Sequence, residues 1–174
     1  MKMYHYVAKG NDVLEKGLLS LAANPNADLS YYYKRSGATD YDGIVRWMES
    51  CFSGRSRSIR CFTETIKWHD RCLNLKRFIE NADLFSFDIE VLAGDGLLDG
   101  VYVSPSVLDV PDIDEETCCD ELLFPLSSYK DIDFSPVDWS VCDEELGRRF
   151  AYIRYYLAIV KGGVIPPQYL TLEK

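Results

Sequence analysis

The sequence has 174 residues and a formal net charge of −9, with 47% hydrophobic and 27% charged residues. This length predicts a single domain spanning residues 1–174, and the globular composition argues against wholesale disorder. The acidic balance argues against non-specific binding of nucleic acid, because phosphate contacts require a basic surface. A local basic patch remains compatible with nucleic acid.

The cysteine content predicts free thiols and a reducing compartment. A disulfide-built secreted domain is usually smaller and denser in cysteine, and no CxxC pair is present. Only two histidines occur, so no metal site is expected. No apolar run of signal length follows Met1, and no stretch approaches the ~20 apolar residues of a membrane span. We therefore expect a cytoplasmic protein that makes no membrane contact. Delivery into a target cell by a route that needs no cleaved signal is compatible with this expectation. The six cysteines are Cys51, Cys61, Cys72, Cys118, Cys119 and Cys142.

The chain begins with patterns typical of a strand and a short helix. Residues 4–8 predict a strand, and residues 13–16 predict a helix that Asn11 or Asp12 can cap and Gly17 can end. Residues 20–38 are predicted to be irregular and include the triplet Tyr31-Tyr32-Tyr33.

A second helix is expected after Asp40, because apolar residues then recur at i, i+3, i+4, i+7 and i+8 before Gly54. Alternation over residues 58–63 predicts a strand. A shorter helix is expected between Cys72 and Ala82.

The second half of the chain predicts further short strands. Alternation marks residues 85–89 and 100–104. An acidic loop over 109–120 precedes the apolar run 122–124. Apolar residues with helical spacing predict a last helix over 143–161, and residues 164–172 predict a final edge segment. The predicted strands and helices alternate unevenly along the chain, which predicts an α+β fold with mixed or antiparallel sheets and flanking helices.

Three short segments are the candidates for chemistry, since common phosphate-loop, dinucleotide-binding and serine-hydrolase motifs are missing. The first is Tyr4-His5-Tyr6 on the predicted first strand. The second is Phe62-Thr63-Glu64-Thr65, where a strand ends in two hydroxyl residues. The third is Asp120-Glu121-Leu122-Leu123-Phe124-Pro125, where an acid precedes a strand.

In this order the segments resemble the ADP-ribosyltransferase superfamily, whose members carry a His or Arg on the first strand, an aromatic-Ser-Thr-Ser strand and a glutamate before an apolar strand. The resemblance covers residues 4–125 and implies an ADP-ribosyltransferase-like fold with NAD as substrate. It implies that His5 positions the NAD ribose, that Thr63 and Thr65 support the NAD pocket, and that Glu121 stabilises an oxocarbenium-like transition state.

The chain departs from the family pattern at three points. Cys119 stands where many members that modify side chains have Glu or Gln, and Glu64 stands where a small hydroxyl residue is usual. A His-type first strand is also combined with the middle and last motifs of the Arg-type branch. The acceptor chemistry therefore stays open.

Other residues suit the remaining parts of such a ligand. Tyr4, Tyr6 or one of Tyr31–Tyr33 can stack on nicotinamide. Arg57 or Arg60 can bind the pyrophosphate through bidentate hydrogen bonds. The run 55–60 that contains both arginines is otherwise a solvated loop or a nucleic-acid contact.

The leading hypothesis is a mono-ADP-ribosyltransferase that modifies a protein or nucleic-acid acceptor, as a bacterial toxin or effector with a possible antitoxin or immunity partner. Two alternatives remain open. The same fold could serve an NAD glycohydrolase or an enzyme like the RNA 2′-phosphotransferases. A non-catalytic interaction or immunity protein suits the acidity and the tyrosine content equally well.

Overall fold

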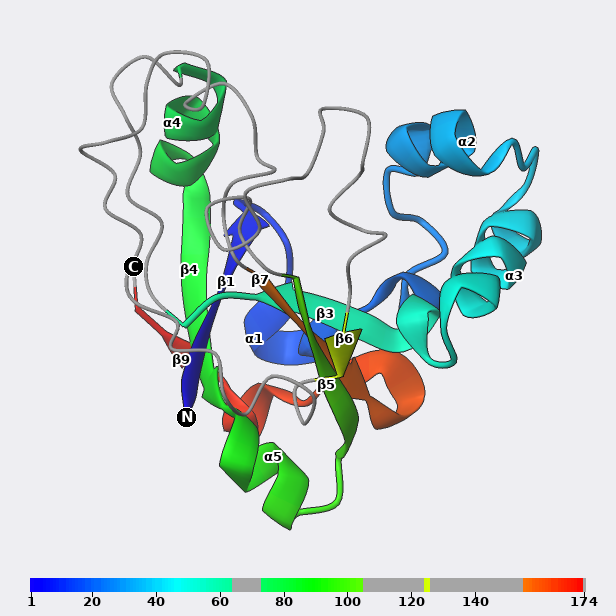
Figure 1. The fold of residues 1–174 in the computed structure, drawn as a ribbon. Coiled ribbons are helices and arrows are strands. Elements are labelled where there is room, and N and C mark those ends of the chain that lie inside the picture. The colour runs from blue at the N-terminus through cyan, green and yellow to red at the C-terminus, as the bar shows by residue number, and fades with distance from the viewer. Residues whose placement is uncertain (64–72, 105–123, 126–154, 174) are drawn as a thin grey trace, which may run out of the picture.

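The computed structural model describes residues 1–63, 73–104, 124–125 and 155–173 (Figure 1). The helices and strands are β1 (Lys2–Ala8), α1 (Val13–Lys16), β2 (Leu18–Leu19), α2 (Ser30–Ser36), α3 (Tyr41–Cys51), β3 (Ser58–Cys61), α4 (Leu73–Glu80), β4 (Ala82–Asp88), α5 (Ile89–Gly94), β5 (Leu98–Ser104), β6 (Phe124–Pro125), β7 (Tyr155–Val160), β8 (Val164–Ile165) and β9 (Thr171–Leu172). Short 3₁₀ segments are η1 (Leu21–Ala23), η2 (Arg55–Arg57), η8 (Lys161–Gly163) and η9 (Pro167–Tyr169).

The described strands form antiparallel sheets. One has the order β1-β4-β9, a second has the order β3-β7-β5-β6, and β2 pairs with β8. Figure 1 shows α4 and α5 at opposite ends of β4, and α2 and α3 to one side of the second sheet. The described part of the chain is therefore α+β with antiparallel sheets, as the sequence predicts.

The two larger sheets meet at one backbone bridge. The Tyr4 amide donates to the Phe62 carbonyl at 2.7 Å, and the Phe62 amide donates back at 2.9 Å. This bridge fixes the end of β3 beside β1, so residues far apart in the sequence come together here. The main apolar core brings together side chains of both sheets, including Met3, Phe85, Phe87, Ile59, Cys61, Val103, Ala158 and Val160.

A smaller apolar cluster lies between the helices. Ile44 and Met48, four residues apart on α3, are buried against Leu29. Asp40 begins the helix as predicted, because its carboxylate accepts a hydrogen bond from the Gly43 amide at 2.6 Å. The hydroxyl of Tyr41 donates to the carbonyl of Leu21 at 2.8 Å and so connects α3 to η1.

The prediction of a helix over 143–161 is wrong for residues 155–160. These residues form β7, which lies between β3 and β5 in the second sheet. Residues 156–160 are all buried, so the segment is a continuous apolar run. Such a run fits a helix and a doubly covered strand equally well by periodicity. Residues 143–154 lie outside the described residues.

The prediction that residues 20–38 are irregular is also wrong in part, since the segment contains η1 and α2. The backbone amide of Ser30 donates to the Asp28 carboxylate, and Gly37 ends α2 in the left-handed conformation with φ 67°. Residues 89–94 form α5, so the prediction of a strand over 85–89 is wrong for Ile89. Asp88 ends β4 and caps α5 by accepting from the amides of Glu90 and Val91.

Within the described ranges, no helix is long and apolar enough to cross a membrane.

Candidate functional site

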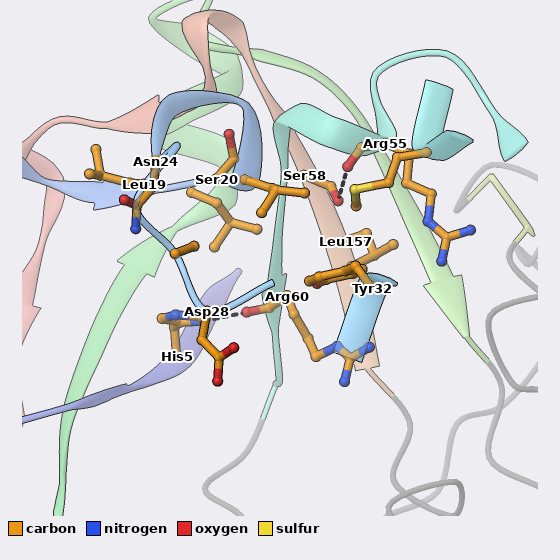
Figure 2. A pocket seen from close by; sticks show the side chains of 14 residues that line it. His5, Leu19, Ser20, Asn24, Asp28, Tyr32, Arg55, Ser58, Arg60 and Leu157 are labelled. Atoms are coloured by element: carbon orange, nitrogen blue, oxygen red, sulfur yellow. Dashed lines mark hydrogen bonds between the residues drawn. The ribbon is translucent and has the colours of Figure 1, made fainter. Parts of the chain in front are cut away.

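A pocket of about 310 Å³ lies where the two larger sheets meet the helical cluster (Figure 2). Its volume is at the small end of the range typical of ligand sites. Its lining combines eight residues with polar or charged side chains and six with apolar side chains. The lining residues are His5, Leu19, Ser20, Leu21, Asn24, Ala27, Asp28, Tyr32, Met48, Arg55, Ser58, Ile59, Arg60 and Leu157.

His5 reaches this pocket from β1, opposite Phe85 in the register of the β1–β4 pair. Its Nδ1 atom lies 2.5 Å from the backbone carbonyl oxygen of Arg60 on β3. A carbonyl can only accept a hydrogen bond, so Nδ1 carries the proton. Burial lowers the pKa of His5, although the bond to the Arg60 carbonyl opposes this shift. The imidazole is therefore neutral near pH 7, and its Nε2 atom is a hydrogen-bond acceptor.

The segment before α2 supplies further polar groups, among them Asn24 and Asp28. In Figure 2 the side chains of His5 and Asp28 are drawn at the same edge of the pocket, with Tyr32 opposite them. The Asp28 carboxylate accepts from the Ser30 amide at 3.0 Å. This hydrogen bond holds the pKa of Asp28 below its usual value. The rim of the pocket thus carries a fixed negative charge beside a neutral acceptor.

The η2 turn is held to α3 by a single carboxylate. Glu49 accepts from the backbone amides of Gly54 and Ser56, at 2.8 and 3.1 Å, and from the Ser56 hydroxyl at 2.5 Å. Arg55 is consequently only 6% exposed, and its guanidinium lies over the rings of Trp47 and Phe52. The alternative that residues 55–60 are a fully solvated loop is therefore wrong for Arg55 and Ser56.

The structure brings three of the residues predicted for the site to the pocket, His5, Arg60 and Tyr32. Tyr4 and Tyr6 alternate with His5 on β1 and are not lining residues, since successive side chains of a strand point to opposite faces. Thr63 follows the Phe62 bridge, is exposed and does not line the pocket. Thr65 and Glu121 lie outside the described residues.

Arg57 points elsewhere. Its guanidinium pairs with the carboxylate of Asp99 at 2.5 Å and approaches the Val160 carbonyl at 3.5 Å. These contacts connect η2 to the start of β5 and to the end of β7. Arg57 is not a lining residue of the pocket.

Sequence reasoning did not select Asp28, Asn24 or Arg55, all of which line the pocket. Asp28 stands two residues before a helix, which is a local capping pattern that can be found in a sequence. Tyr32 belongs to the tyrosine triplet already selected for stacking. In the described ranges, no three His, Cys, Asp or Glu side chains gather closely enough to hold a metal ion.

Comparison of the chain with protein-family models, with curated proteins and with solved structures finds no match in any of the three.

Proposed function

We propose that the chain is a mono-ADP-ribosyltransferase that binds NAD in the pocket between β1, β3 and α2. The observation that carries the proposal is the bond between His5 Nδ1 and the Arg60 carbonyl, which leaves Nε2 of this lining residue as the hydrogen-bond acceptor. An acceptor of this kind suits a ribose hydroxyl, which is the role that the family resemblance implies for His5.

The other groups of the pocket fit the remaining parts of NAD. Tyr32 provides an aromatic ring for stacking on a flat base. Arg60 provides guanidinium donors, whose geometry matches phosphate oxygens. The pocket lining combines polar and apolar side chains, and polar groups placed in this way fix the orientation of a bound small molecule.

The reaction breaks the bond between nicotinamide and ribose C1′, and the electron pair of that bond leaves with nicotinamide. An acceptor atom then forms a new bond to C1′ and loses a proton. Positive charge develops on the ribose in between, so a fixed carboxylate lowers the barrier. Glu121 is the residue predicted to supply this carboxylate, and it precedes β6 by three positions in the sequence.

The test is incubation of the full chain with labelled NAD, with and without cell lysate. Label transferred to a lysate component supports the transferase, whereas release of free ADP-ribose without transfer favours an NAD glycohydrolase. The variant Glu121→Gln should lower turnover about a hundredfold, because it removes one transition-state stabiliser. Its NAD affinity should stay within a few-fold of wild type, since the transition state feels the lost charge far more than bound NAD does.

The matched control is Glu15→Gln, which changes an exposed residue of α1 that does not line the pocket. It should turn over NAD like wild type. Equal turnover of Glu121→Gln and wild type would remove Glu121 from the mechanism. A wild-type chain that neither binds nor consumes NAD in the presence of lysate would instead favour the interaction-protein alternative.

A further inference from the structure

The charges around the pocket are unevenly arranged. Among its described lining residues, Asp28 carries the one negative charge, while Arg55 and Arg60 carry positive charges. Figure 2 shows the Asp28 carboxylate at the His5 edge and both guanidinium groups toward the Tyr32 side. A ligand with a cationic end and an anionic end would therefore be favoured in one orientation.

The negative charge at this edge is held in place. Asp28 immediately precedes the buried Leu29 and accepts the hydrogen bond from the Ser30 amide, which fixes its carboxylate at the start of α2. The same bond keeps its pKa below the usual value, so the group is ionised at neutral pH. Asp28 is exposed, however, and water weakens its field. Its effect on a ligand is therefore one of orientation and selectivity.

We propose that Asp28 makes the pocket selective for a positively charged nicotinamide ring, so that the oxidised form of NAD is favoured over NADH. This inference rests on the proposed function and adds to it that the ribose bound at His5 is the one that carries nicotinamide. The oxidised ring bears one positive charge that the reduced ring lacks, while the ribose and pyrophosphate groups of the two ligands are the same. A comparison of the affinities for NAD and NADH therefore isolates the effect of the charge on the nicotinamide ring.

The expected change in NAD affinity follows from Coulomb's law with the dielectric constant of water, because Asp28 is exposed. Two unit charges about 4 Å apart in water interact by about 1 kcal/mol, which corresponds to roughly a fivefold change in affinity. Screening by salt should reduce it further.

The experiment is isothermal titration of the full chain with NAD and, separately, with NADH at low ionic strength. The variant is Asp28→Asn, whose amide oxygen can still accept from the Ser30 amide. We expect Asp28→Asn to weaken NAD binding roughly fivefold and to change NADH binding less than about twofold. The difference should shrink at high salt, which a purely structural role of Asp28 would not produce.

The matched control is Asp42→Asn, which makes the same substitution at an exposed residue in the first turn of α3 that does not line the pocket. It should leave both affinities unchanged. Equal weakening of NAD and NADH by Asp28→Asn, or no weakening of either, overturns the proposal while the proposed function stands. If wild type binds neither dinucleotide, the proposed function fails and the charge selection fails with it.

Discussion

The Nδ1 atom of His5 donates a hydrogen bond to the backbone carbonyl of Arg60, a residue 55 positions further along the chain. The backbone bridge between Tyr4 and Phe62 lies one residue from His5 and two residues from Arg60. The two interactions together fix β1 against the end of β3. His5 is therefore part of the packing between the sheets as well as a residue of the pocket.

This dual position predicts how stability depends on pH. Burial lowers the pKa of His5 in the folded chain, while the unfolded chain takes up a proton near pH 6.5. The folded state thus binds fewer protons than the unfolded state below that pH. The contribution of neutral His5 is present above about pH 6.5 and is lost as pH falls toward its lowered native pKa.

The measurement is urea unfolding of wild type and His5→Asn from pH 7.5 to pH 5. Asn keeps an N–H donor for the Arg60 carbonyl but does not titrate. The free energy of unfolding of wild type should therefore fall more steeply below pH 6.5 than that of the variant. His69 is present in both proteins and contributes equally. Parallel profiles would show that His5 binds protons equally in the folded and unfolded states.

The two arginines that the sequence suggests for pyrophosphate binding, Arg57 and Arg60, are expected to have different roles. Arg60 lines the pocket, and Arg60→Ala should weaken NAD binding about tenfold or more, since a hydrogen bond to a charged group contributes about 1.5–3 kcal/mol. Its backbone carbonyl, which holds His5, is unchanged by the substitution. Arg57 pairs with Asp99 instead.

Arg57→Ala should lower the free energy of unfolding by about 0.5–1 kcal/mol, because the ion pair is partly exposed. Its NAD affinity should equal that of wild type in the same titration. Weaker NAD binding by Arg57→Ala than by Arg60→Ala would reverse the assignment of the two residues.

A third prediction concerns Glu49, which holds η2 to α3. Desolvation raises the pKa of Glu49, but the hydrogen bonds from Ser56 and Gly54 outweigh it, so the pKa is lower than usual. Its contribution to stability is consequently present above about pH 4.5 and is lost as pH falls through the lowered native value.

Glu49→Gln should lower the free energy of unfolding at pH 7 by about 1 kcal/mol or more, because hydrogen bonds to a charged group are replaced by weaker ones. The deficit should shrink toward pH 3, because protonation of the wild-type carboxyl as pH falls through its lowered pKa removes the charge that Gln lacks. Urea unfolding at both pH values measures this. A deficit that does not change with pH would mean that the ionised carboxylate is not what holds η2. Asp42→Asn again supplies an exposed control on the same helix.

The sequence predicts those helices and strands whose apolar periodicity and capping residues lie within a short stretch of the chain. The alternation of β4 and the capped apolar face of α3 are examples. The pocket could not be predicted this way, because it depends on the Tyr4–Phe62 bridge and on the contact from Tyr41 to Leu21. These contacts join segments that are about 20 to 60 residues apart. The sequence predicts a helix where β7 lies, since its pairing with β3 and β5 is visible only in the folded sheet.

The last prediction concerns the two cysteines that the structure describes as free thiols, Cys51 at the end of α3 and Cys61 at the end of β3. Burial strongly raises the pKa of the Cys61 thiol, whose Sγ donates to the Tyr156 carbonyl. Cys51 is exposed. Because the thiolate is the reactive form, Cys61 should react with a thiol reagent only when the chain unfolds.

The experiment compares the reaction of Ellman's reagent with folded, non-reduced wild type and with Cys51→Ser and Cys61→Ser variants. Cys51→Ser should lose one thiol from the fast phase, while Cys61→Ser should leave that phase unchanged and lose one thiol from the total in denaturant. The denatured wild type should give nearly six thiols, as its cysteine spacing predicts. Three disulfides in the non-reduced chain would overturn the expectation of a reducing compartment. A fast Cys61 would mean that the contact between β3 and β7 opens readily, because the thiol is covered by that pair.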